Sequence, residues 1–183
     1  MKRKTIKTVG LSVLAVCAIA LSILLGFQLR RHNAEKAQRE QQEMLLQTIP
    51  RITLLTADSL PVNLGDLCAI GQPIVIFYFH PECEFCQLEI NELLAQKELL
   101  DNVLPVFVTT LASPDDVAEF EKTHPISSID NAVLLFDRKF VLSTEYGIQS
   151  PPQTMIYNGE GHLVKHFRGF VMINDLLQAL QEL

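Results

Sequence analysis

The chain has 183 residues, four cysteines and a formal net charge of −6, which leaves room for one domain of ordinary size plus additional segments. Before Pro50 there are eight Lys or Arg and three Glu, whereas the rest of the chain carries seven basic and eighteen acidic side chains. This acidic balance excludes a nucleic-acid partner, because proteins that bind phosphate backbones need a basic face to displace counterions.

Residues 9–29 ("VGLSVLAVCAIALSILLGFQL") form a run without any charge. As a helix that rises about 1.5 Å per residue, this run covers roughly 30 Å, the thickness of the hydrocarbon core of a bilayer. It therefore predicts one transmembrane helix. A signal peptide is the alternative, but its apolar region is usually only about 7 to 15 residues and ends in a small-x-small site, which this run lacks. Lipoprotein processing at Cys17 is disfavoured because the apolar run continues well beyond it.

The basic residues next to the span predict its orientation. Residues 1–8 are expected to form a basic cytoplasmic tip, and the acidic part after the span is expected to face the periplasm from the inner (cell) membrane. Residues 30–49 are rich in helix-forming polar residues and predict a stalk that is either helical or flexible. Residues 50–183 form the globular domain.

Short strands dominate the first part of this domain. Residues 51–57 and 60–67 predict a hairpin whose turn contains Asp58 and Ser59. Continuous β-branched and aromatic runs predict buried strands. These runs are residues 73–79, 103–110 and 132–136.

Helices are predicted between and after the strands, at residues 88–101, from Ser113 to about Thr123, at 140–147, and from an Asn174 cap to Leu183. A second hairpin is predicted where Asn158–Gly161 joins two further strands. This order predicts an α/β fold with a mixed central sheet, helices on both faces and an N-terminal β-hairpin extension.

Cys83 and Cys86 lie at the boundary between a predicted strand and a predicted helix. Unpaired amides at a helix start stabilise a nearby anion, so Cys83 is expected to be the exposed nucleophile. Cys86 lies one turn further along the same helix face and is expected to resolve a mixed disulfide formed by Cys83. The pair therefore predicts a redox-active disulfide.

A zinc site and a structural disulfide are less favoured for this pair. Zinc needs about four ligands, and the chain offers one CxxC pair plus scattered histidines, His80, His162 and His166. A structural disulfide across so short a loop would constrain the unfolded chain only weakly. We expect neither a bound metal nor a cofactor.

The segments "FYFHPECEFCQLEINEL" and "YGIQSPPQTMIY" resemble the thioredoxin superfamily, and in particular the membrane-anchored TlpA-like thiol-disulfide oxidoreductases. The resemblance covers residues 51–183 and implies a thioredoxin-like sheet. It also implies that Pro152, preceded by Pro151, is a cis-proline that faces the CxxC pair and binds substrate. Glu89 matches an acid of this family and would accept a proton from Cys86; a solvated helix residue is the alternative.

The sequence departs from the thioredoxin pattern beside the nucleophile. Glu82 replaces the usual Trp, and the residues between the cysteines are Glu84 and Phe85, with neither Pro nor His. These acids oppose stabilisation of a thiolate, which favours a reductant or isomerase-like donor over a disulfide-forming oxidant. The resemblance implies disulfide-containing cell-envelope proteins as partners and a membrane thiol transporter as electron donor.

Two other functions remain open. A peroxiredoxin-like peroxidase would need Thr three residues and Pro seven residues before Cys83, where this chain has His80 and Ile76. A metal-binding assembly module for copper or zinc would hold metal through its thiols. Cys68 is expected to be a buried hydrophobic residue.

Overall fold

The structure is a computed structural model that describes residues 2–110 and 112–183, without the side chains of residues 2–20, 22, 69 and 70. The chain divides into two compact units, Met1–Gln41 and Gln42–Leu183.

Helix α1 (Lys2–Leu45) accounts for the N-terminal unit. Its polar stretch is supported by ion pairs one turn apart, Arg31–Glu35 at 3.0 Å and Lys36–Glu40 at 3.7 Å. Among the residues that the structure describes, no helix is both long and apolar enough to cross a membrane. Most side chains of the predicted 9–29 span lie outside the described residues, so the division into tip, span and stalk stays a prediction.

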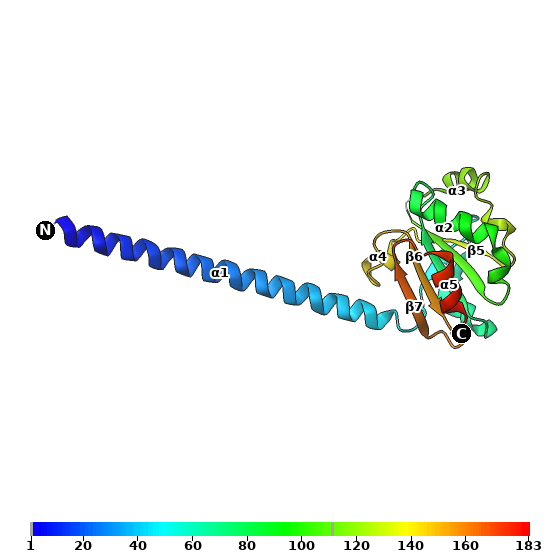
Figure 1. The fold of residues 1–183 in the computed structure, drawn as a ribbon, viewed down its shortest axis with the longest axis horizontal. Coiled ribbons are helices and arrows are strands. Elements are labelled where there is room, and N and C mark those ends of the chain that lie inside the picture. The colour runs from blue at the N-terminus through cyan, green and yellow to red at the C-terminus, as the bar shows by residue number, and fades with distance from the viewer. Residues whose placement is uncertain (1, 111) are drawn as a thin grey trace. The chain divides into compact units, whose positions relative to one another are not determined.

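In the described part of the globular unit, one mixed sheet has the strands β1 (Thr53–Leu55), β2 (Pro61–Asn63), β3 (Ile74–Phe79), β4 (Leu104–Thr109), β5 (Val133–Phe136), β6 (Gln153–Tyr157) and β7 (Leu163–Arg168) (Figure 1). Their spatial order is β2-β1-β5-β4-β3-β6-β7. Strands β3, β4 and β5 are parallel, whereas β6 and β7 continue the sheet antiparallel beyond β3. The predicted N-terminal hairpin is present as β1 and β2, and β1 pairs antiparallel with β5.

The connections between the strands carry the helices η1 (Leu64–Ile70), α2 (Glu84–Ala95), η2 (Lys97–Leu100), α3 (Pro114–Glu121), η3 (Ile126–Ser128) and α4 (Val141–Thr144). Helix α5 (Ile173–Leu180) follows the last strand, β7. Helices α2 and α5 lie together on one face of the sheet (Figure 1). The start of α3 is the predicted one, because Ser113 and Asp116 form a reciprocal capping box there.

Central strand β3 is buried on both faces and separates two hydrophobic cores. Successive side chains of a strand point to opposite faces of the sheet. Ile74, Ile76 and Tyr78 therefore pack into the core that contains η1 and α4 residues. Val75, Phe77 and Phe79 pack into the other core, against α2 and α5. The predicted mixed α/β architecture, with helices on both faces, is confirmed.

Two local predictions are wrong, and both concern caps. The predicted strand 60–67 ends at Asn63, because the Asn63 side chain accepts from the amide of Gly65 at 2.9 Å and starts η1. Asn174 does not cap the last helix, which begins at Ile173 after Met172. The amide of Ile173 donates instead to the Glu92 carboxylate of α2 at 3.3 Å.

We predict opposite effects on stability from removing two buried tyrosine hydroxyls. In the described residues the Tyr157 hydroxyl is buried without a hydrogen-bond partner, whereas the Tyr78 hydroxyl lies 3.0 Å from Thr110 Oγ1. Leaving a buried polar group unpaired costs free energy, so Tyr157→Phe should keep or raise the free energy of unfolding, while Tyr78→Phe should lower it by about 1 kcal/mol. Urea denaturation of both variants measures this, and a larger loss for Tyr157→Phe than for Tyr78→Phe would contradict it.

Candidate redox site

The redox turn, residues 80–83, follows directly from the end of β3. After Phe79 the chain turns, and the Cys83 amide donates to the His80 carbonyl at 3.0 Å. Helix α2 then begins at Glu84 with Cys83 as its N-cap. The Cys86 amide donates to Cys83 Sγ at 3.4 Å, so a sulfur occupies the place that an oxygen of Ser, Thr, Asp or Asn usually takes.

The two sulfurs of this turn lie in different environments. Cys83 is half-buried, whereas only 1% of the Cys86 surface is exposed. Two causes raise the pKa of the Cys86 thiol: burial is the larger, and the hydrogen bond with Cys83 is the second. The geometry therefore offers one sulfur to a partner and keeps the other inside, one helical turn away.

The predicted proline segment lies beside Cys83. The peptide bond between Pro151 and Pro152 is cis, as the sequence resemblance implies. Cys83 Sγ lies 4.0 Å from the Pro151 carbonyl oxygen, which accepts from the thiol. The segment is held there because β6, which follows it, pairs with β3, which precedes the redox turn. A role of Pro151 and Pro152 in substrate binding stays a prediction.

Glu89 lies in α2, one turn beyond Cys86, and only 4% of its surface is exposed. Burial raises the pKa of its carboxyl group. Its Oε1 accepts from Thr154 Oγ1 at 2.7 Å and its Oε2 accepts from the Val171 amide at 3.3 Å. The alternative of a solvated helix residue is therefore wrong, while its function in proton transfer stays a prediction.

Thr154 is a residue of this site that was not predicted from the sequence. It lies on β6, opposite Phe77 of β3 and Phe167 of β7, and therefore faces α2. A polar residue within the apolar run "QTMIY", two positions after Pro152, is the signal that could have identified it.

Two of the histidines considered as metal ligands, His80 and His166, have other hydrogen-bond partners. His80 Nδ1 accepts from the Glu82 amide at 3.2 Å and so stabilises the redox turn. His166 Nε2 lies 2.8 Å from Gln153 Oε1, and burial lowers its pKa to about 4. In the part of the chain that the structure describes, no three side chains of His, Cys, Asp or Glu are grouped to hold a metal ion.

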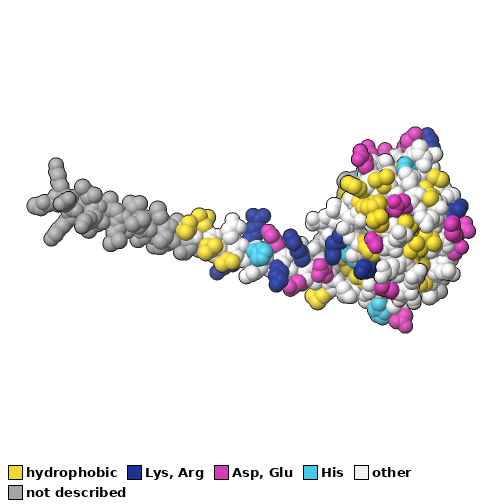
Figure 2. Space-filling model, in the orientation of Figure 1, with side chains coloured by type: hydrophobic (Ala, Val, Ile, Leu, Met, Phe, Trp, Pro, Cys, Tyr) yellow, Lys and Arg dark blue, Asp and Glu magenta, His cyan; other side chains and the backbone are white. Residues whose placement is uncertain are grey.

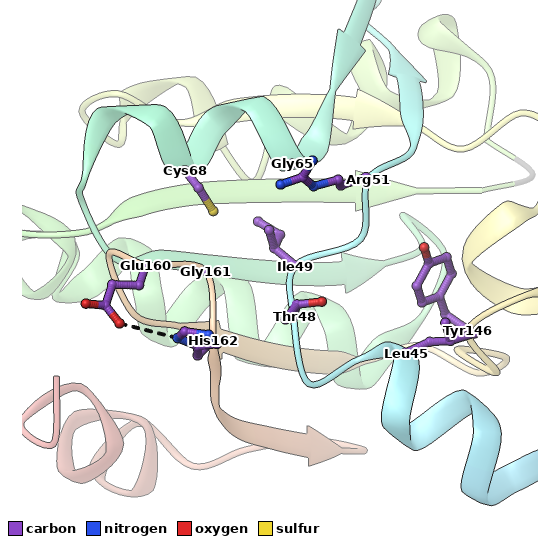
Figure 3. Close-up of a pocket in the computed structure, with 10 residues that line it drawn as sticks. All are labelled: Leu45, Thr48, Ile49, Arg51, Gly65, Cys68, Tyr146, Glu160, Gly161 and His162. Atoms are coloured by element: carbon purple, nitrogen blue, oxygen red, sulfur yellow. Dashed lines mark ion pairs between the residues drawn. The ribbon is translucent and has the colours of Figure 1, made fainter.

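Cys68 is half-buried rather than buried, and its side chain points from η1 toward Ile49 (Figure 3). It lines a hollow of about 400 Å³ that also contains Arg51 and the ion pair between Glu160 and His162. None of the residues around this hollow belongs to the redox turn. Burial raises the pKa of the Cys68 thiol, which does not favour a nucleophile.

The structure brings together a turn with two cysteines at the start of a helix, a cis-proline beside the outer sulfur and a buried acid one turn beyond the inner one, which is the arrangement predicted for dithiol-disulfide exchange. The sequence matches the thioredoxin-like domain family over residues 60–183, and the chain belongs to this family. The predicted membership of the thioredoxin superfamily is confirmed.

Solved structures share this fold. One is a secreted disulfide oxidoreductase of Mycobacterium tuberculosis homologous to E. coli DsbE, at 20% identity over 73% of this chain and 96% of that chain, with a TM-score of 0.61. A putative thiol:disulfide interchange protein DsbE from Chlorobium tepidum matches at 18% identity over 74% and 94%, with a TM-score of 0.62. The exposed lipoprotein thioredoxin of Streptococcus pneumoniae matches at 22% identity over 72% and 98%, with a TM-score of 0.57.

No curated protein matches the sequence significantly. At these low identities the solved structures establish the fold. Together with the family match, they support the predicted enzyme class, a thioredoxin-like thiol-disulfide oxidoreductase.

We predict that Glu89 makes the stability of the protein depend on pH. The native chain keeps the Glu89 proton at pH values where the unfolded chain has released it. The contribution of Glu89 is therefore fully present below its ordinary pKa of 4.5 and is lost as the pH rises through the raised native pKa. Glu89→Gln cannot lose a proton, so its free energy of unfolding relative to the wild type should rise from acid to neutral pH, by about 1.4 kcal/mol per unit of pKa elevation.

Urea titrations at several pH values measure this difference. Thr154→Val supplies a matched test, because it removes a hydrogen bond that lowers the pKa of Glu89 and should extend the pH-dependent range upward. A difference between Glu89→Gln and the wild type that is constant with pH would contradict the prediction.

Proposed function

We propose that this chain is a membrane-anchored, extracytoplasmic thiol-disulfide oxidoreductase that reduces protein disulfides. The observation that carries the proposal is the asymmetry of the pair, with Cys83 half-buried beside the Pro151 carbonyl and Cys86 buried one turn behind it. Such a pair separates the thiol that meets a partner from the thiol that completes the exchange.

The reaction begins with the Cys83 thiolate. It attacks one sulfur of a partner disulfide, forms a mixed disulfide and releases the other partner sulfur as a thiolate. Cys86 then attacks Cys83 Sγ, so that the Cys83–Cys86 disulfide forms and the second partner sulfur leaves. Two electrons pass to the partner. The chain is returned to the dithiol by a reduced thiol donor.

Glu89 is proposed to accept the proton of Cys86 during the second step. The Cys86 thiol has to lose its proton to become a nucleophile, and burial raises its pKa. A buried carboxylate with a raised pKa is a suitable acceptor, because its affinity for a proton is closer to that of the thiol. The Glu89 oxygens are oriented by Thr154 and Val171.

The proposed direction of electron flow rests on charge near Cys83. Glu82 and Glu84 are exposed on either side of it, and no cationic residue stands between the two cysteines. A strongly oxidising pair needs a heavily stabilised thiolate, which adjacent carboxylates disfavour. Reduction of partner disulfides is therefore the favoured direction.

The proposed location rests on the uncharged run at residues 9–29 and on the basic residues before it. In this arrangement the globular unit faces the periplasm, where protein disulfides persist. Disulfide-containing cell-envelope proteins are the proposed substrates, and a membrane thiol transporter is the proposed electron donor.

We predict that Cys86→Ser accumulates mixed disulfides with partner proteins. This variant keeps the attacking sulfur but lacks the sulfur that releases the partner, so the intermediate should persist. Cys83→Ser should form no such adducts, and Cys68→Ser, in the separate hollow, should resemble the wild type. Non-reducing electrophoresis with mass spectrometry of trapped envelope proteins measures the outcome; adducts formed equally by Cys83→Ser would contradict the proposed roles.

We predict a reducing potential for the Cys83–Cys86 pair, below about −200 mV and so in the range of reductants such as thioredoxin. Equilibration of the full chain with glutathione or dithiothreitol redox buffers measures it. A potential above about −150 mV would reverse the proposed direction of electron flow. Peroxide consumption at enzymic rates would instead favour the peroxidase function.

A further inference from the structure

The segment beside Cys83 offers little backbone pairing to a partner. Pro151 and Pro152 have no amide hydrogen, and the Pro152 carbonyl accepts from the Gly169 amide at 3.0 Å. Of these two residues, only the Pro151 carbonyl can accept from a partner, and only once the Cys83 thiol that donates to it at 4.0 Å has lost its proton. Pairing of a partner as an added strand needs both donors and acceptors, so the Pro151–Pro152 segment is poorly suited to it and exposed side chains gain importance for recognition.

A pair of exposed aromatic side chains includes Phe85, in the first turn of α2 and two residues after Cys83. Phe85, between the two cysteines, is 60% exposed, and its ring lies 6.4 Å from that of Phe170, which is 39% exposed. Leu88, one turn along α2 from Phe85, and Met172, close in sequence to Phe170, are also more than half exposed. A partner attached to Cys83 can bury apolar surface against Phe85 and Phe170, which is favourable in water.

Two exposed acidic residues flank Cys83 in the sequence. Glu82 and Glu84 are exposed, and neither side chain has a hydrogen-bond or ion-pair partner among the residues that the structure describes. Acidic side chains are spread over the visible face of the globular unit, with hydrophobic side chains exposed between them (Figure 2). From Pro50 onward the chain has eighteen acidic and seven basic side chains, and this excess of negative charge attracts basic partners and repels acidic ones.

We propose that the partner of Cys83 is a polypeptide disulfide whose cysteine has a Lys or Arg neighbour and a bulky apolar neighbour. This inference rests on the proposed reductase activity and names its substrate class. Glu82 and Glu84 select the charge, and Phe85 and Phe170 select the apolar side chain. Three of these residues, Glu82, Glu84 and Phe85, stand where the sequence departs from the usual thioredoxin pattern.

The test compares four disulfides reduced by the full chain in nonionic detergent. Three are synthetic peptide disulfides of equal length, whose cysteines are flanked by Lys and Phe, by Glu and Phe, or by Lys and Ser. The fourth is hydroxyethyl disulfide, which is small and neutral. Each peptide rate constant is divided by that for hydroxyethyl disulfide, so that a change in the intrinsic reactivity of Cys83 cancels.

For the wild type at low salt, the Lys-Phe peptide should react at least about tenfold faster than the Glu-Phe peptide. The ratio should fall to within about threefold in roughly 0.5 M NaCl, because salt screens exposed charges. In the double variant Glu82→Gln/Glu84→Gln, the ratio of the two rate constants should fall to within about threefold already at low salt. Glu98→Gln/Asp101→Asn, which removes two exposed carboxylates beyond the other end of α2, should keep the wild-type ratio.

The aromatic contact is tested with the remaining peptide. The wild type should prefer the Lys-Phe peptide over the Lys-Ser peptide by roughly fivefold or more, and Phe85→Ser/Phe170→Ser should abolish this preference. If the wild type reduces hydroxyethyl disulfide but treats the three peptides alike, the inference is overturned while the proposed reductase activity stands. If it reduces none of the four disulfides, the proposed activity fails and the inference fails with it.

Discussion

The Cys86 amide donates a hydrogen bond to the sulfur of Cys83, and this contact determines how the rest of the site can work. It places a cysteine at the N-cap of α2, where the chain leaves buried strand β3. The outer sulfur then remains accessible, while the next cysteine falls one turn later on the buried face of the helix. The difference in exposure, on which the proposed exchanging and resolving roles rest, therefore follows from the spacing of two cysteines at a helix start.

Helix α2 also connects the inner sulfur to the surface that a partner would meet. The Glu89 side chain accepts a hydrogen bond from the amide of Val171, in the segment that joins β7 to α5, and the Glu92 side chain accepts one from the amide of Ile173, the first residue of α5. Phe170 belongs to this segment and lies beside Phe85. The acid proposed to accept the Cys86 proton thus helps to hold an exposed aromatic side chain beside Phe85. In our proposal, proton transfer and partner recognition therefore depend on the same hydrogen bonds.

Most of the fold could be predicted because it is encoded locally. The continuous apolar run of β3, the Ser113 capping box and the cysteine pair at a helix start are each readable within about ten residues. The contacts of Glu89 could not be predicted in this way. Thr154 and Val171 lie 65 and 82 positions away in the sequence, and their approach depends on the register of β6 and on the docking of α5. The start of α5 depends on Glu92 for the same reason.

The relative alkylation rate of the two thiols in the fully reduced chain tests the roles of Cys83 and Cys86 most directly. Brief treatment with iodoacetamide, followed by mass spectrometry of the labelled peptides, gives a rate for each cysteine. Because Cys86 is buried with a raised pKa and Cys83 is partly accessible, Cys83 should be labelled at least about tenfold faster. Equal rates, or faster labelling of Cys86, would contradict the assignment of Cys83 as the attacking sulfur.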